Sequence, residues 1–260
     1  TWDSYAGQGA RITFENNSNS FTGLIIVKAS KAFQLSGTDV VNNQPVENDG
    51  SLVLNAGAGN TTTIGTLTGA NTGICEIHST VTGPQTLSIG NDNGSGTYDG
   101  IIRNAGTGST QVMNLEKAGT GTQLFTGINT YTGATAVNEG MLGGTGSISS
   151  SSTTTVNNGG AIMGGTGIGS AGTFTTGKLV FANASSAAVN VYSNGSSLSF
   201  IQVNGTCALG TTTKVNLMEA MPAGTYNIIS STGTMNGTLP TLGINLSGHT
   251  VTITKAGKNL

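Results

Sequence analysis

The sequence predicts an all-β fold, a single-stranded parallel β-helix (β-solenoid) of about 12 rungs of roughly 20 residues each, which we expect to be right-handed. Two motifs recur at a near-constant spacing. Val137-Asn138-Glu139-Gly140 returns one such interval later as Val156-Asn157-Asn158-Gly159, and Gly143-Gly144-Thr145-Gly146 returns as Gly164-Gly165-Thr166-Gly167. The chain also contains 42 glycines for turns and many short runs in which apolar and polar residues alternate. A repeat of this length, built of strands and turns, is typical of a solenoid.

The N-terminal region differs from the rest. The sequence therefore predicts residues 1–50 as a cap-like or first-rung region and residues 51–260 as β-helix rungs. Five of the aromatic residues fall in the first region, at Trp2, Tyr5, Phe14, Phe21 and Phe33. Large side chains would fill a cap or a wider first rung, and the alternative is an aromatic patch that binds a ligand.

Apolar pairs at a spacing of two residues mark the strands, each with mostly polar neighbours. In chain order they are Leu52/Leu54, Leu87/Ile89, Met113/Leu115, Leu179/Phe181, Val189/Val191, Val215/Leu217 and Val251/Ile253. Because one rung alone buries too little apolar surface to fold, stacked rungs must share a continuous core. We expect the following residues to face it, unless a strand is misread by one position: Leu115, Leu124, Val137, Leu179, Val203, Val215 and Leu217.

The last predicted strand is followed by no helix or folded-over loop that would close the coil. We therefore expect the β-helix to be open at its C-terminal end, with strand edges that could accept strands from another chain. Either the sequence is a segment of a longer repeat protein, or copies associate end to end through the solenoid ends. Such a head-to-tail contact could propagate as a filament.

Composition excludes several classes of partner. Charged residues make up only 8% of the chain, the net charge is −2, and the basic residues form no stripe, so we expect no nucleic-acid partner. No apolar run approaches the ~20 residues that span a bilayer, and no signal peptide is recognisable, so we expect a mature or excised segment without a membrane span.

The two cysteines, Cys75 and Cys207, each share a strand face with an apolar neighbour. We expect both to be buried packing thiols, because free cysteine behaves as a small apolar residue. A bridge between them is not expected, since rungs so far apart would not bring the two Cα atoms within roughly 7 Å.

Three consecutive sequence elements carry a family resemblance: Gly96-Thr97-Tyr98-Asp99-Gly100-Ile101-Ile102, Leu115-Glu116-Lys117-Ala118-Gly119-Thr120-Gly121-Thr122 and Thr126-Gly127-Ile128-Asn129-Thr130-Tyr131-Thr132-Gly133. In this order they resemble the autotransporter-associated β-strand repeat of autotransporter passenger-like parallel β-helices, and similar rungs extend the resemblance over about residues 94–254. The resemblance implies a secreted or surface-exposed parallel β-helix of Gram-negative-type bacteria, a kind of segment often found in long adhesins.

No catalytic, cofactor-binding or metal-binding residue is predicted, and we expect no enzyme activity and no cofactor. The carboxylates are isolated, whereas a polysaccharide lyase needs them clustered, and only Glu116, Glu139 and Lys117 could meet through stacking. Residues 91–96 read as a turn rather than a calcium loop, because the further carboxylates of such loops are missing. His78 and His249 have no partner ligands at metal-site spacing.

We therefore expect a structural or adhesive segment of a secreted or cell-surface bacterial protein, acting as a stiff β-helical stalk or extracellular fibre unit. Its receptor would be a host or surface glycan or protein. The alternative is a carbohydrate-binding or carbohydrate-cleaving β-helix, with a cleft lined by Trp2, Tyr5 or neighbouring carboxylates. Ice binding is a third class, but its threonine ladders would recur rung by rung, and the Thr-x-Thr runs here do not.

Overall fold

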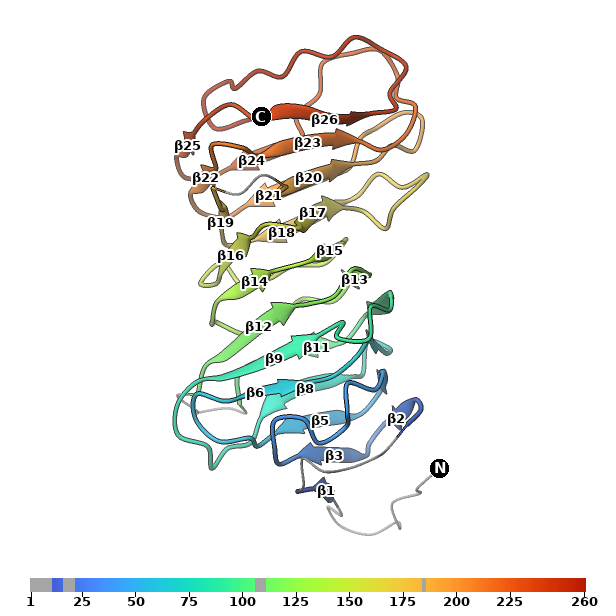
Figure 1. Ribbon diagram of the computed structural model, residues 1–260, viewed down its shortest axis with the longest axis vertical. Helices are drawn as coiled ribbons and strands as arrows, with labels where there is room; N and C mark the ends of the chain where they lie inside the picture. Colours follow the sequence, from blue (N-terminus) through green and yellow to red (C-terminus); the bar gives the residue numbers. More distant parts are fainter. Residues whose placement is uncertain (1–10, 16–21, 106–110, 184–185) are drawn as a thin grey trace. The chain divides into compact units, whose positions relative to one another are not determined.

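The computed structural model describes residues 11–15, 22–105, 111–183 and 186–260 of the chain. These residues form 26 strands and no helix, which confirms the all-β prediction. The chain divides into two compact units, unit 1 (Thr1–Ala134) and unit 2 (Thr135–Leu260). Within each unit, strands from successive turns lie side by side in parallel, so each unit is a parallel β-solenoid (Figure 1). The handedness of the coil stays a prediction.

Unit 1 contains three sets of stacked strands, one for each side of the coil. The first ladder is β1 (Arg11–Phe14), β3 (Ala32–Leu35), β5 (Ser51–Leu54), β8 (Ile74–Ile77) and β11 (Ile101–Ile102). The second set is β2 (Ile25–Val27), β4 (Val46–Asn48) and β7 (Leu67–Thr68), continued through a bridge between Gly69 and Tyr98 by β10 (Gly96–Tyr98) and β13 (Thr122–Phe125). The third ladder is β6 (Thr61–Thr63), β9 (Gln85–Ile89) and β12 (Met113–Lys117).

Unit 2 repeats this three-sided arrangement. The first ladder is β14 (Thr135–Val137), β16 (Thr153–Val156), β19 (Lys178–Phe181), β22 (Cys207–Leu209) and β25 (Met235–Gly237). The second is β15 (Gly140–Gly144), β17 (Gly160–Gly164), β20 (Ala188–Val191), β23 (Lys214–Leu217) and β26 (Thr241–Asn245). The third is β18 (Thr173–Thr176), β21 (Phe200–Val203) and β24 (Ile229–Ser231).

The length of a turn varies more than the sequence motifs suggested. Val137 pairs with Val156, as the repeated motif predicts. Elsewhere the step along the chain is longer, since Leu87 pairs with Leu115 and Leu179 pairs with Cys207. Longer turns mean fewer of them, so the described chain makes about nine turns rather than the 12 rungs expected.

Side chains alternate between buried and exposed along the strands, and the buried ones form the core. Six of the seven predicted apolar pairs are buried within strands, in β5, β9, β12, β19, β20 and β23. Of the residues predicted to face the core, all but Leu124 are buried. Because successive side chains of a strand point to opposite faces, this agreement fixes the register of most turns.

The prediction for Leu124 is wrong by one residue. In β13 the inward positions belong to Gln123 and Phe125, both buried, and Leu124 is partly exposed. The Gln123 amide donates to the Leu67 carbonyl oxygen at 2.8 Å and accepts from the Leu67 N–H at 3.3 Å. Satisfied by these bonds to the backbone of β7, a polar side chain can occupy a core position that apolar patterning assigned to leucine.

The C-terminal end differs from the expectation that no segment folds over it. Residues 256–260 turn back antiparallel to β24, with the Ser231 N–H donating to the Lys258 carbonyl at 2.9 Å and the Leu260 N–H to the Ile229 carbonyl at 2.9 Å. The edge of β24 is therefore covered. Val251 and Ile253 were predicted to form a strand. They instead belong to no strand and lie in the segment that precedes residues 256–260.

Candidate functional site

Unit 1 contains a buried polar cluster at Cys75. The Asn48 amide donates to the Tyr98 hydroxyl at 3.0 Å and to the Cys75 sulfur at 3.4 Å, and all three residues are inaccessible to solvent. Burial raises the pKa of the Cys75 thiol to about 12 and also raises the pKa of the Tyr98 phenol. Neither group is poised to ionise near neutral pH, so the cluster is a buried core network rather than a nucleophilic site, and within it the Asn48 side-chain oxygen accepts no hydrogen bond from the described residues.

Cys207 is likewise buried, on β22 of unit 2, and burial raises the pKa of its thiol to about 12. Both cysteines are free. The prediction that they are buried packing thiols is confirmed.

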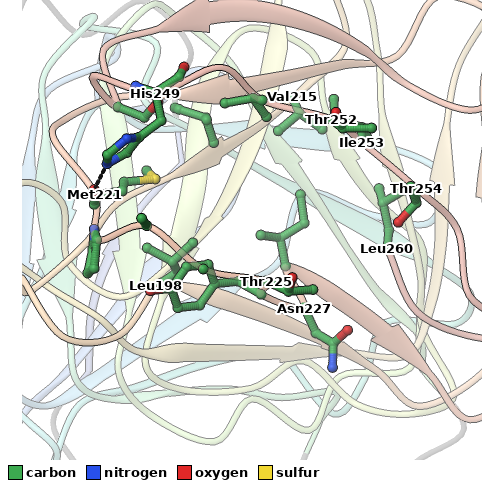
Figure 2. A pocket seen from close by; sticks show the side chains of 18 of the residues that line it. Leu198, Val215, Met221, Thr225, Asn227, His249, Thr252, Ile253, Thr254 and Leu260 are labelled. Atoms are coloured by element: carbon green, nitrogen blue, oxygen red, sulfur yellow. Dashed lines mark hydrogen bonds between the residues drawn. The ribbon is translucent and has the colours of Figure 1, made fainter.

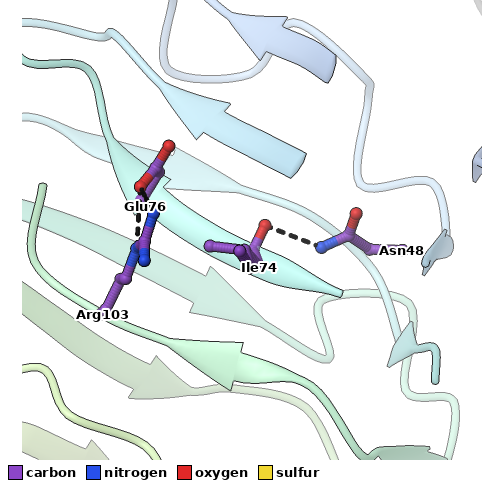
Figure 3. A network of polar contacts seen from close by, with 4 residues as sticks. All are labelled: Asn48, Ile74, Glu76 and Arg103. Atoms are coloured by element: carbon purple, nitrogen blue, oxygen red, sulfur yellow. Dashed lines mark hydrogen bonds and ion pairs between the residues drawn. The ribbon is translucent and has the colours of Figure 1, made fainter. Parts of the chain in front are cut away.

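An ion pair and an amide contact join successive turns of unit 1 (Figure 3). Arg103 donates two bonds to one Glu76 carboxylate oxygen, through Nε at 2.8 Å and Nη2 at 2.6 Å. The Asn48 amide donates to the Ile74 carbonyl at 3.0 Å. Both contacts pin neighbouring turns in register, and the partly exposed ion pair adds little stability.

Lys117, which the sequence placed beside Glu116 in a conceivable active site, points inward. It is fully buried at the end of β12, and its ammonium donates to the carbonyl oxygens of Ala118 at 2.5 Å and Gly119 at 2.7 Å. Glu116 occupies the opposite, partly exposed face of the strand. A buried ammonium held by backbone carbonyls closes a corner of the coil and cannot reach a surface substrate.

Side chains within residues 91–96 form hydrogen bonds inside their own loop and to neighbouring turns. The Asp92 carboxylate accepts from the Thr66 hydroxyl at 2.9 Å and from the Gly94 N–H at 3.0 Å. Asn93 accepts from the Thr120 N–H at 3.0 Å, and its φ of 61° is the left-handed conformation of a tight turn. This geometry is that of a corner, and within the described parts of the chain no three His, Cys, Asp or Glu side chains gather as metal ligands.

The N-terminal aromatic patch falls only partly within the described residues. Trp2, Tyr5 and Phe21 lie outside them. Phe14 and Phe33 pack with ring centroids 5.1 Å apart at an interplanar angle of 57°. That tilted pair belongs to the stacking of β1 on β3.

One feature that the sequence did not predict is a cavity of about 570 Å³ near the C-terminal end of unit 2 (Figure 2). Its volume falls in the usual range for ligand sites, about 300–1,000 Å³. Its lining is mostly aliphatic, with hydroxyl and amide side chains between, and includes Val215, Leu217, Met221, Tyr226, Asn227, Ile228, His249, Val251, Ile253 and Leu260. These side chains fit apolar groups bordered by hydrogen-bonding groups.

One wall of the cavity is an extended segment that we call the strap, residues 250–254. Val251 and Ile253 are partly buried, whereas Thr250, Thr252 and Thr254 are exposed. None of these five residues forms a hydrogen bond within the described chain. Just before the strap, the His249 ring bonds the Met221 carbonyl at 2.9 Å (Figure 2), which ties the start of the strap to the loop after β23. His249 therefore has a structural contact here, and His78 bonds the Thr80 hydroxyl at 2.7 Å on the surface of unit 1.

Alternation of apolar residues in the strap was the one signal that could have pointed to the cavity. The sequence showed Val251 and Ile253 at a strand spacing, but it could not show that no neighbouring turn pairs with them. The cavity walls also come from the loops after β23 and β26, whose lengths follow no motif.

The turn at residues 126–133 has a buried and an exposed part. The Asn129 side chain accepts from the Ile102 N–H at 2.9 Å, and Asn129 and Tyr131 are both buried. Ile128, by contrast, is 68% exposed. The Asn129 side chain thus accepts the hydrogen bond that a further strand would otherwise accept from β11. The Tyr131 side chain fills the core at this corner.

Comparison with protein families places this turn in a known repeat. Residues 115–142 match the passenger-associated-transport-repeat. The match, together with the parallel solenoid, bears out the resemblance to autotransporter passenger β-helices, over a shorter range than residues 94–254. A search of curated proteins and a search of solved structures each gave no match.

Within the passenger repeat, the distinctive residues serve the coil itself. Lys117 and Gly119 form the corner after β12, and Asn129 and Tyr131 form the corner after β13. These residues of the repeat motif therefore form the turns of the solenoid.

Proposed function

We propose that this chain is a structural segment of a secreted or cell-surface bacterial protein, in which it serves as a stiff β-helical stalk or fibre unit with an adhesive role and no enzymatic one. The observation that carries the proposal is the passenger repeat at residues 115–142 within a coil of parallel strands. Ladders of backbone hydrogen bonds on three sides of each unit make every turn resist bending against the next.

The chemistry of the described residues supports a structural role. Buried polar side chains such as Lys117 and Gln123 bond to backbone groups. The side chains of residues 91–96 likewise serve corners. None of the described residues belongs to a helix long and apolar enough to cross a membrane.

Surface labelling tests the location. An antibody raised against the folded chain should label intact, unpermeabilised cells of the producing bacterium, and protease added outside should remove the signal. Labelling only after permeabilisation would contradict the proposal.

A glycan array and a cell-adhesion assay test the adhesive role. Beads coated with the chain should bind a host or bacterial surface above a level set by beads coated with albumin, and bound glycans should be recovered intact. Release of shortened glycans would instead favour the carbohydrate-cleaving alternative.

A further inference from the structure

The strap in unit 2 has the properties of a strand without a neighbour. It alternates apolar, partly buried residues with exposed threonines, and its backbone N–H and C=O groups make no hydrogen bond within the described chain. Such a row of unpaired groups is a template for pairing with another strand. Beside it lies the cavity of about 570 Å³, which offers space for apolar side chains of that strand.

The edge strand β26 is less suited to accept a strand. Its pairing with β23 shifts register, because Val215 pairs with Leu242 but Leu217 pairs with Asn245. The extra residue makes a bulge, a common device against strand addition. The edge of β24 is covered by residues 256–260. These two differences make the strap a better accepting segment than β26 or β24.

Unit 1 holds a matching free edge at β2. The Ile25 N–H donates to the Pro45 carbonyl at 2.9 Å, and the Val27 carbonyl accepts from the Asp49 N–H at 2.8 Å. In a parallel ladder the intervening residue points its backbone groups to the other side, so the N–H and C=O of Ile26 face away from β4. Within the described chain no residue bonds them. The side chains of Leu24 and Ile26 are 50% and 39% exposed.

We propose that copies of this chain associate head to tail, with β2 of one copy pairing along the strap of the next and its apolar side chains entering the cavity. A second copy is the partner because the same chain carries both unpaired edges, one in each unit, and within its described residues pairs neither of them itself. The two surfaces differ, so the contact is heterologous and can propagate. The stalk proposal does not depend on this inference, since a monomeric segment would serve equally as a stalk.

The contact involves one strand pair and one cavity. It therefore buries less surface area than a standard protein–protein interface, which buries about 1,600 Å². We therefore expect weak association, with a dissociation constant on the order of 10–100 µM. Sedimentation velocity of the full 260-residue chain between about 1 and 300 µM covers that range.

Thr252→Pro is the sharpest probe. Proline removes the Thr252 N–H, which has no partner in the described chain, so the fold loses no hydrogen bond while the edge loses a donor. Thr252→Ala retains the N–H and is the matched control. We expect the unchanged chain and Thr252→Ala to gain mass with concentration and Thr252→Pro to stay monomeric, with all three melting within about 2 °C of each other. Ile26→Pro blocks the other edge and should also be monomeric.

Mixing the two proline variants tests the pairing itself. Thr252→Pro retains an intact β2 and Ile26→Pro an intact strap, so an equimolar mixture should form a dimer that cannot grow. If circular dichroism shows that Ile26→Pro disrupts the first turn, Thr252→Pro added to the unchanged chain should cap growth and lower the mean mass. The proposal is overturned if the unchanged chain is monomeric throughout, if Thr252→Pro associates as the unchanged chain does, or if neither mixture behaves as described.

Discussion

Lys117 shows at the residue scale how the solenoid uses a charged side chain in its interior. The stem fills core space at the end of β12, and the ammonium bonds the Ala118 and Gly119 carbonyls where the chain leaves the strand. Sequence patterning treats lysine as a surface residue, because burial of a charge is unfavourable unless it is paired. Here carbonyl oxygens supply the pairing, and no sequence pattern marks carbonyls that a turn leaves without partners.

Removing this side chain should be costly. Lys117→Ala should lower the free energy of unfolding by about 2–4 kcal/mol, since it leaves both a void and unpaired carbonyls. Lys117→Met restores most of the volume but not the hydrogen bonds, and should cost less than alanine. Urea unfolding measures the free energy of unfolding of both variants. Lys28 is exposed, so Lys28→Ala is the control and should stay within about 0.5 kcal/mol of the unchanged chain. A Lys117→Met variant as stable as the unchanged chain would show that the carbonyl bonds contribute nothing.

The buried thiols predict a pH dependence. Their pKa of about 12 in the fold lies above the value of 9.0 for a free thiol, so the native state retains protons that the unfolded state loses. Their contribution is complete below pH 9 and is lost as the pH rises from 9 to 12. At pH 10 ionisation of each thiol in the unfolded state should lower the free energy of unfolding by about 1 kcal/mol relative to pH 8. Cys207→Ala should therefore lose less stability than the unchanged chain over that interval, and equal losses in urea unfolding would contradict the assignment.

At the scale of elements, close stacking of the turns limits which residues the corners accept. Gly119 follows β12 with a φ of 65°, and a Cβ there would overlap the Gly90 carbonyl oxygen of the turn before. The left-handed backbone and the close approach both require glycine. Gly59 has a similar φ of 76°, but a Cβ there would meet nothing within 4 Å.

These two glycines form a matched pair for mutation. Gly59→Ala should cost about 1–2 kcal/mol, the strain of a left-handed alanine. Gly119→Ala should cost at least about 1 kcal/mol more, because the turn must also move away from the Gly90 carbonyl. Thermal melting ranks the two variants, and a Gly59→Ala protein less stable than Gly119→Ala would show that stacking distance is not the limiting factor.

The strap should exchange its amide hydrogens far faster than the ladders. Its N–H groups have no acceptor in the described chain, whereas β19 and β22 lie inside a ladder with a strand on either side. Hydrogen exchange followed by mass spectrometry at low protein concentration should show residues 250–254 deuterated within seconds and β19 and β22 protected for hours. Slow exchange of the strap in dilute monomer would mean that it pairs within its own chain.

At the scale of the whole molecule, the sequence predicted the fold class but not the details of each turn. Alternating apolar pairs and a motif repeated at near-constant spacing identified parallel strands, because these signals follow from burial on one face. Turn length was underestimated, since loops such as residues 165–172 extend a turn without disturbing its strands. Gln123 and the cavity could not be predicted, because both depend on which backbone groups remain unpaired after stacking.

Stability of the whole chain should not depend on divalent cations. The Asp92 carboxylate already accepts hydrogen bonds from the Thr66 hydroxyl and the Gly94 N–H, and the Asn93 side-chain oxygen accepts one from the Thr120 N–H. Melting with and without a chelator should give the same midpoint, because removal of a structural ion would lower it.

Asp92→Ala separates the two interpretations of this loop. If Asp92 holds the corner, the variant should melt about 2–4 °C lower whether or not chelator is present, since it loses the bonds to Thr66 and Gly94. If Asp92 binds calcium, the chelator should lower the midpoint of the unchanged chain and leave that of Asp92→Ala unaltered, which would restore the calcium-loop interpretation of residues 91–96.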